Sequence, residues 1–131
     1  ITSPGLRFIT GLLRRRFVPP TDIMELPDRI RVLVEIAGMQ RDNLNITLVN
    51  RTLVISGIRG RNTEDIAAYH QLEIGYGEFR VEVKLAWSID QDEVSATYQD
   101  GFLQVDLPRR AEKNVHVSGV REETEKHDTQ V

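Results

Sequence analysis

Apolar and polar residues alternate one by one along much of this chain, and this period of two constrains the fold more than any other feature. In the clearest example Val81, Val83 and Leu85 alternate with charged residues. Successive side chains of a β-strand point to opposite faces, whereas helical spacing would mix the two kinds of residue on one face. The pattern therefore predicts strands with one buried face. The alternating stretches are residues 30–36, 44–48, 81–85 and 103–107.

Turn-forming residues separate these stretches. Asn50-Arg51 lies between two expected strands as a tight hairpin, and Gly75-Tyr76-Gly77 and Asp100-Gly101 mark two further breaks. Residues 59–68 form a longer polar connection before an expected strand at 69–74. Hairpins rarely need so long a loop, so we expect it to carry this strand away from its sequence neighbours. Short strands without helical segments between them predict an all-β, antiparallel, immunoglobulin-like sandwich.

The chain length of 131 residues suits one domain with short arms. Residues 1–18 mix apolar and basic residues, and Pro19-Pro20 ends any helix there, which predicts a short helical N-terminal arm. We expect the sandwich in residues 19–108 and a flexible C-terminal extension in the largely polar residues 109–131. Because the chain starts at Ile1 and not at methionine, we expect further residues to precede it.

Composition argues against several kinds of partner and site. The net charge of -3 is nearly balanced and the one basic run, Arg14-Arg15-Arg16, is short, so we expect no nucleic-acid partner. No apolar stretch approaches the ~20 residues of a membrane span. The chain has no cysteine, which rules out disulfides and thiolate metal sites and suits a cytoplasmic location.

No catalytic or cofactor-binding pattern is evident in the sequence. His70, His116 and His127 lie far apart along the chain, and no nucleophile motif accompanies them. Gly75 and Gly77 precede an expected strand and not a helix, so they do not match a phosphate-binding loop. We therefore expect no enzyme activity, no cofactor and no metal site.

Four segments, in the same order, resemble the small heat-shock protein family of the bacterial and archaeal type, whose members carry an α-crystallin domain. Residues 96–108, ATYQDGFLQVDLP, are similar to its Ala…Gly-x-Leu signature, its most specific motif. Residues 32–57 resemble a strand, a glycine turn and a strand hairpin of that domain. Residues 19–26 resemble its first strand, and residues 69–79 the strand that members exchange in a dimer. Together the segments lie within residues 19–108.

The resemblance implies an ATP-independent chaperone, a holdase that binds unfolding client proteins and prevents their aggregation. It also implies homo-oligomers built from strand-exchanged dimers, with no chemistry of their own. A co-chaperone of the CS-domain type shares the sandwich and is the alternative, which a monomeric state in solution would favour. A sandwich enzyme or lectin-like domain is a further alternative and would need a polar cluster in a cleft.

The resemblance implies that residues 69–74 leave their own sandwich and pair with the first strand of a partner subunit. An unpaired strand edge exposes backbone donors and acceptors, which a second copy can satisfy. The alternative is a strand within its own sheet. The expected contacts come from Tyr69, Gln71, Leu72 and Ile74 on one side, and from Asp22, Ile23, Met24 and Leu26 on the partner's edge.

Val115-His116-Val117 resembles the Ile-x-Ile or Ile-x-Val tripeptide of the family's C-terminal extension, which fills a groove on a neighbouring dimer. Alternation puts both valines on one side of an extended segment, as two adjacent pockets require. The resemblance places the groove between strands 43–49 and 93–98. The alternative is that residues 114–118 form a final strand of their own domain. The expected groove residues are Leu44, Ile46, Leu48 and Val94.

Apolar residues at helical spacing within residues 1–18 indicate an amphipathic arm. The resemblance implies that this arm binds clients or fills the interior of the oligomer. A membrane-surface helix with Arg14–Arg16 at its edge is the alternative, but each basic residue contributes only ~1 kcal/mol, so we expect no membrane association. The arm residues are Leu6, Phe8, Ile9, Leu12 and Leu13.

Two residues depart from the family pattern. Val81 stands where the strand after the Gly-Tyr-Gly turn usually has an arginine, and Ala86 stands where that strand usually ends in a proline. The arginine commonly supports the dimer interface, so the resemblance implies a dimer that is weaker here or braced in another way. Neither residue disturbs the alternation, and the expected fold is unchanged.

Overall fold

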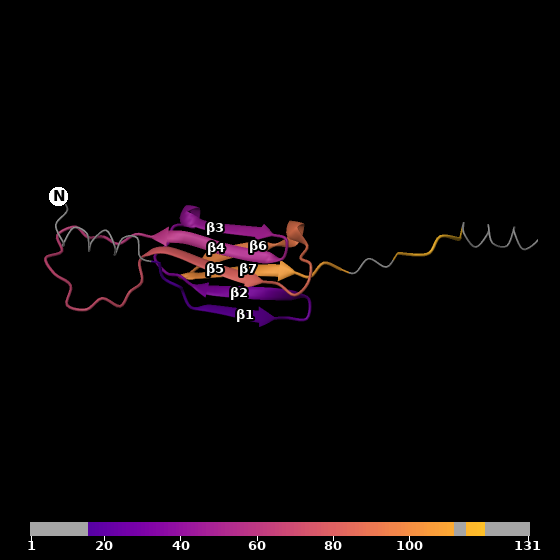
Figure 1. Ribbon diagram of the computed structural model, residues 1–131, viewed down its shortest axis with the longest axis horizontal. Helices are drawn as coiled ribbons and strands as arrows, with labels where there is room; N and C mark the ends of the chain where they lie inside the picture. The colour runs from indigo at the N-terminus through magenta and orange to yellow at the C-terminus, as the bar shows by residue number, and fades with distance from the viewer. Residues whose placement is uncertain (1–15, 112–114, 120–131) are drawn as a thin grey trace, which may run out of the picture.

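The computed structural model describes residues 16–111 and 115–119. Within them the chain forms β-strands joined by loops, with two short 3-10 helices (Figure 1). The all-β prediction is therefore confirmed. The strands are β1 (Thr21–Glu25), β2 (Arg29–Glu35), β3 (Leu44–Val49), β4 (Thr52–Arg59), β5 (Gly77–Lys84), β6 (Ser95–Gln99) and β7 (Phe102–Pro108), and the 3-10 helices are η1 (Arg41–Asn43) and η2 (Gln91–Glu93).

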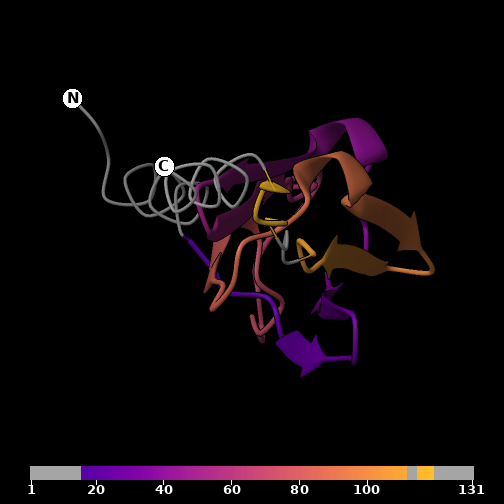
Figure 2. The same cartoon turned by 90° about the vertical axis from the view of Figure 1, so that its right-hand side faces the viewer.

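The strands form two antiparallel sheets that pack face to face. One is four-stranded with the order β1-β2-β7-β6, and the other is three-stranded with the order β3-β4-β5. In Figure 1, β3 runs along the upper margin of the sandwich, β1 runs along the lower margin, and β6 lies behind β4. Figure 2, seen from one end of the strands, shows β1 and β6 at opposite sides of their sheet. Strands joined by hairpins share a sheet, and the chain crosses from one sheet to the other between β2 and β3 and again between β5 and β6.

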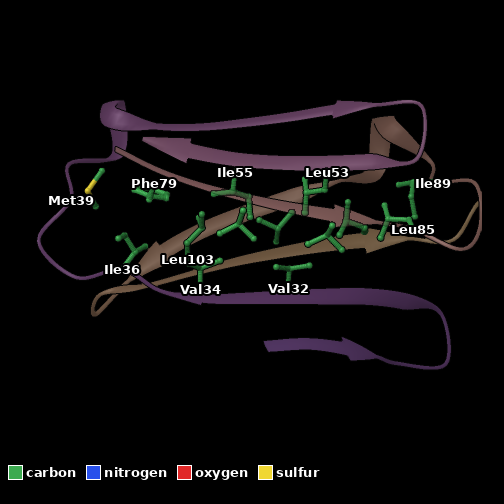
Figure 3. Packing of buried hydrophobic residues seen from close by; sticks show 14 residues of the cluster. Val32, Val34, Ile36, Met39, Leu53, Ile55, Phe79, Leu85, Ile89 and Leu103 are labelled. Carbon is green, nitrogen blue, oxygen red and sulfur yellow. The ribbon is translucent and has the colours of Figure 1, made fainter. Parts of the chain in front are cut away.

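The core lies between the two sheets and takes the apolar side chains that the alternation assigns to one face (Figure 3). In β5 the pattern is strict, because Phe79, Val81 and Val83 are buried while their neighbours are exposed. Each fully buried side chain of this size contributes roughly 1.5–3 kcal/mol relative to an exposed one. The other core residues are Val32, Val34, Ile36, Met39, Leu53, Ile55, Leu85, Ile89, Leu103, Val105 and Leu107.

Two predicted turns are tight hairpins. Asn50 and Arg51 join β3 to β4, with Asn50 at a φ of 57°. Asp100 and Gly101 join β6 to β7 with φ values of 53° and 82°, and positive φ at both central residues fits the right-handed twist of a hairpin. Gly101 is also sterically required, since an added Cβ would lie 3.0 Å from the Ala37 side chain.

The strand expected at 69–74 is absent from the single chain. Arg59, the last residue of β4, pairs directly with Gly77, the first residue of β5. The intervening residues 60–76 therefore form a long connection that is closed at its base and extends past the ends of the strands (Figure 1). Residues 69–74 belong to no strand of the sandwich, so the alternative of a strand within its own sheet is not what the structure shows.

The expected N-terminal arm lies mostly outside the described residues, as do all its apolar residues: Leu6, Phe8, Ile9, Leu12 and Leu13. Its last residues are described. Phe17 forms a parallel bridge to Phe79 at the beginning of β5, and its backbone N–H donates to the Glu78 carbonyl at 2.9 Å.

Candidate assembly surfaces

The outer edge of β1 is the first candidate surface. Within the described part of the chain β1 pairs with β2 alone, so one row of its backbone groups faces outward. Ile23 lies opposite Val32 on the core-facing side of the sheet, yet it is 56% exposed. Asp22 is exposed as well, and Met24 and Leu26 are half-buried. The expected partner edge is therefore an apolar strand margin that its own chain leaves uncovered.

The segment expected to pair with that edge lies at the other end of a loop. Tyr69, Gln71 and Ile74 are exposed, and Leu72 is half-buried. Within the described chain these residues and the β1 edge are not brought together, because the loop projects beyond the strand ends while β1 runs along the lower margin (Figure 1). Pairing between them would require a second copy of the chain.

A groove of about 520 Å³ opens between β3 and β6, where the margins of the two sheets meet. Leu44 and Ile46 line it, as the sequence predicts. The other two expected residues, Leu48 and Val94, do not line it, although all four are half-buried and pack against the core. The groove residues that the sequence analysis missed are Arg41, Ala96, Thr97, Tyr98, Gln99 and Leu103. Tyr98 could have been predicted from the sequence, since alternation in β6 places its side chain on the inner face of the sheet.

Tyr98 fixes one wall of this groove. Its hydroxyl donates to the Ile36 carbonyl at 2.7 Å and accepts from the Met39 N–H at 3.2 Å. Both bonds hold the connection that follows β2, which turns at Gly38 with a φ of 77°. The groove is therefore shaped before anything binds, and binding to a shaped site costs less conformational entropy.

The C-terminal extension leaves the sandwich at the end of β7. Arg109 forms an isolated bridge with Ile89 and its N–H donates to the Asp28 carbonyl at 3.0 Å. Its guanidinium group lies 4.9 Å from the centre of the Trp87 ring. Val115 and Val117 are 82% and 69% exposed, and they belong to no strand. The alternative of a final strand is thus wrong for this structure, and two apolar side chains are left uncovered.

Charged groups on the outer face of the four-stranded sheet form a network around Asp106. Arg31 donates to both carboxylate oxygens of Asp106, at 2.8 and 3.2 Å, and Arg29 donates to one of them at 3.3 Å. The hydrogen bonds from Arg31, with the positive charges of both arginines, lower the pKa of Asp106 below its usual 3.8. The Asp106 carboxylate in turn raises the pKa of Arg31. The network ties β2 to β7 and keeps Asp106 ionised at neutral pH.

Val81 lies where the resemblance implies an arginine at the dimer interface. Its side chain is 8% exposed and it pairs with Ile55 on β4, so it contributes to the core. Ala86 follows the end of β5 and is exposed. The described residues contain no cluster of His, Asp or Glu arranged to hold a metal ion. No helix in the described ranges is long and apolar enough to span a bilayer.

The fold and these surfaces define a class of protein: a β-sandwich with open strand edges and a C-terminal extension. Comparisons with known proteins identify the family. Residues 22–122 match the model of the Hsp20/alpha crystallin family. The chain therefore belongs to the Hsp20/alpha crystallin family of small heat-shock proteins.

Individual relatives agree with this assignment. The small heat shock protein C4 of Rickettsia felis is 31% identical over 93 residues, which are 70% of this chain and 57% of that protein. The probable 15 kDa heat shock protein of Leptospira interrogans is 28% identical and covers 73% of each chain. The chain thus spans little more than half the length of the first of these relatives.

Solved structures share the fold. The small heat-shock protein from Xylella fastidiosa superposes with a TM-score of 0.71 at 24% identity, covering 79% of this chain and 96% of that one. HSP18.5 from E. histolytica superposes with a TM-score of 0.64 at 26% identity, covering 77% and 97%. The predicted α-crystallin sandwich is confirmed by these superpositions.

Proposed function

We propose that this protein is an ATP-independent holdase that captures unfolding client proteins as a homo-oligomer built from strand-exchanged dimers. The observation that carries the proposal is that one chain contains both of the surfaces needed for each of two contacts between subunits. It has an open β1 edge and an unpaired segment 69–74, and it has an apolar groove and two exposed valines. Each contact is incomplete in the single chain, and a second copy supplies the other surface.

The first contact is pairing of residues 69–74 with the β1 edge of a partner. The main-chain groups on both sides lack strand partners within the described chain, and Ile23, Leu72 and Ile74 supply apolar surface. Antiparallel or parallel pairing would satisfy the backbone groups and bury those side chains. Reciprocal exchange between two copies gives a closed dimer with two identical contacts.

The second contact is insertion of Val115 and Val117 into the groove of a neighbouring subunit. The groove lies beside Leu103 near the beginning of β7, whereas the extension leaves at Pro108. Five residues of strand span roughly 17 Å, and residues 109–114 reach at most ~20 Å when extended. The groove extends along β6 to Ala96, opposite Val105, so the extension would have to reverse its direction after Pro108 to enter its own groove. In the single chain both valines are exposed, which supports a groove on another subunit.

Client capture follows from the same apolar surfaces. When an oligomer loosens, its grooves and N-terminal arms are uncovered, and burying exposed apolar surface of an unfolding protein is favourable without nucleotide energy. A cytoplasmic location is part of the proposal. No chemical step is part of the proposal.

The test is a client-aggregation assay. The purified full chain should suppress heat-induced aggregation of a model client at near-stoichiometric ratios, with equal efficiency in the presence and absence of ATP, as measured by light scattering. A groove variant, Ala96→Asp, should suppress less while keeping its β-sheet circular dichroism, because Ala96 lines the groove and is exposed. Dependence on ATP hydrolysis, or a monomeric chain with no suppression, would overturn the proposal, and the monomer would favour a co-chaperone module of the CS-domain type.

A further inference from the structure

Two arginines at the end of β4 lie between the N-terminal arm and the connection that carries residues 69–74. The Arg59 guanidinium is 4.7 Å from the centre of the Phe17 ring and 5.3 Å from that of Tyr76. The Arg61 guanidinium is 4.3 Å from Tyr76 and 5.2 Å from Tyr69. Cations at such distances from aromatic rings are attracted to their faces. We call this group of two guanidinium groups and three rings the arginine clamp.

Hydrogen bonds give the clamp a defined geometry. Arg59 donates to the Gly75 carbonyl through Nε at 3.0 Å and also through Nη2, while its Nη1 donates to the Ala37 carbonyl at 3.0 Å. Arg61 donates to the Ile74 carbonyl at 3.2 Å. Hydrogen bonds from charged donors are stronger than neutral ones, and a planar guanidinium holds two acceptors at fixed angles. The arginines thus hold the end of the segment that is proposed to pair with a partner.

The same clamp holds the end of the N-terminal arm. The Phe17 ring lies under Arg59 and 5.7 Å from the Phe79 ring, so it contacts both the clamp and the core. Gly75 fits directly against it, because an added Cβ at Gly75 would lie 2.8 Å from atoms of the Phe17 ring. A displacement of either segment therefore disturbs the other.

We propose that the arginine clamp couples the position of the N-terminal arm to strand exchange, so that releasing Phe17 weakens the dimer and loosening the dimer frees the arm. This inference rests on the proposed strand-exchanged dimer and deepens it. The clamp also supplies the brace that Val81, buried in the core, does not. Coupling of two sites through shared contacts is reciprocal, so it can be tested from either end.

The first experiment perturbs the coupling from each end in the full chain. Phe17→Ala removes the ring from the arm side, and Gly75→Ala displaces it from the loop side. Each should raise the dissociation constant of the dimer about tenfold, a factor that corresponds to ~1.4 kcal/mol, and the double variant should show less than the sum of the two effects. Sedimentation velocity over a dilution series gives the constants. Gly60→Ala is the matched control, since nothing lies within 4 Å of an added Cβ there.

The second experiment tests the arginine itself. Arg59→Lys keeps the charge but loses the planar guanidinium group with its paired donors. It should therefore raise the dissociation constant of the dimer as much as Arg59→Ala does. In both variants the Phe17 N–H, which donates to the Glu78 carbonyl, should exchange with deuterium faster. Arg80→Ala removes an exposed guanidinium from β5 that pairs only with Glu82 among the described ion pairs, and should change neither measurement.

The outcomes separate the coupling from the dimer model. Unchanged dissociation constants and unchanged Phe17 exchange in the clamp variants would refute the coupling even if the dimer forms by strand exchange. If the wild-type chain dimerises through another edge, the strand-exchange model fails, and Phe17 exchange in Gly75→Ala still decides whether the clamp links arm and loop. A uniform loss of thermal stability across the clamp variants, with no change in dimerisation at a temperature where all are folded, would also overturn the proposal.

Discussion

Asp106 is a single residue on the outer face of a sheet that stabilises the fold. It is nearly buried between Arg29 and Arg31, and the two arginines come from β2 while Asp106 comes from β7. Hydrogen bonds to charged groups contribute about 1.5–3 kcal/mol, more than those between neutral groups. The network is therefore a stabilising contact between neighbouring strands, at a position where alternation alone would predict a solvated side chain.

We expect Asp106→Asn to lower the free energy of unfolding by about 1–3 kcal/mol, because two guanidinium groups lose their charged acceptor. The pKa of Asp106 is lowered by folding, so its contribution is fully present above the usual aspartate value of 3.8 and is lost as pH falls through the lower folded-state value. Urea denaturation across this range should show wild type and variant converging in acid. Asp92→Asn, at an exposed position in η2, is the control. A difference that persists unchanged at low pH would contradict the electrostatic explanation.

At the scale of elements, the C-terminal extension and the groove can be altered to test assembly without unfolding the sandwich. The extension begins at a bridge between Arg109 and Ile89, and Val115 and Val117 are exposed beyond it. The groove is built by β3, β6 and the beginning of β7, with Tyr98 hydrogen-bonded in place. Changing the two valines should therefore affect contacts between subunits and leave the sandwich intact.

The variant Val115→Glu with Val117→Glu puts two carboxylates where the proposed contact needs two apolar side chains. Burying an unpaired charge costs several kcal/mol, more than a small groove contact supplies. Higher oligomers should dissociate to dimers in native mass spectrometry, while the melting temperature of the sandwich stays the same. His116→Glu is the control, because alternation places this residue on the other side of the segment. If assembly and melting both match the wild type, these residues are not an anchor.

At the scale of the whole molecule, a strand edge and a loop segment have no pairing partner within the described part of the single chain. The β1 edge is unpaired in the described chain, and residues 60–76 leave their own sandwich because β4 and β5 pair up to Arg59 and Gly77. A long exposed edge is a hazard for a soluble protein unless something covers it. The proposed exchange of residues 69–74 between two chains would cover the β1 edges of both chains at once.

Deleting residues 69–74 should convert the dimer to a monomer, because the partner's β1 edge loses its pairing segment. The sandwich itself should remain folded, since none of these residues belongs to the core cluster. Analytical ultracentrifugation gives the mass and circular dichroism the fold. Deleting residues 62–65 instead, also in the connection, should preserve the dimer. A stable dimer after the first deletion would show that another edge joins the subunits.

The sequence by itself determined the alternating strands of the sandwich, their buried faces and two of their hairpins, but its expected strand at 69–74 is absent from the single chain. Alternation and hairpin turns are local properties. The alternation in β5 depends only on the order of its residues, and the Asp100-Gly101 turn depends on the positive φ angles that these two residues tolerate. The resemblance to a family added the identity of the sandwich, which the comparisons confirm. The pairing segment, the anchor and the arm remain predictions.

Only the tertiary structure decided which residues from distant strands meet. Leu44, Ile46, Leu48 and Val94 all pack against the core, but only Leu44 and Ile46 lie where β3 and β6 approach each other and line the groove with Tyr98. Arg59 and Phe17 meet because the base of a long loop and the start of β5 close against each other. Such contacts arise from non-local pairing, and no local period in the sequence encodes which strands become neighbours.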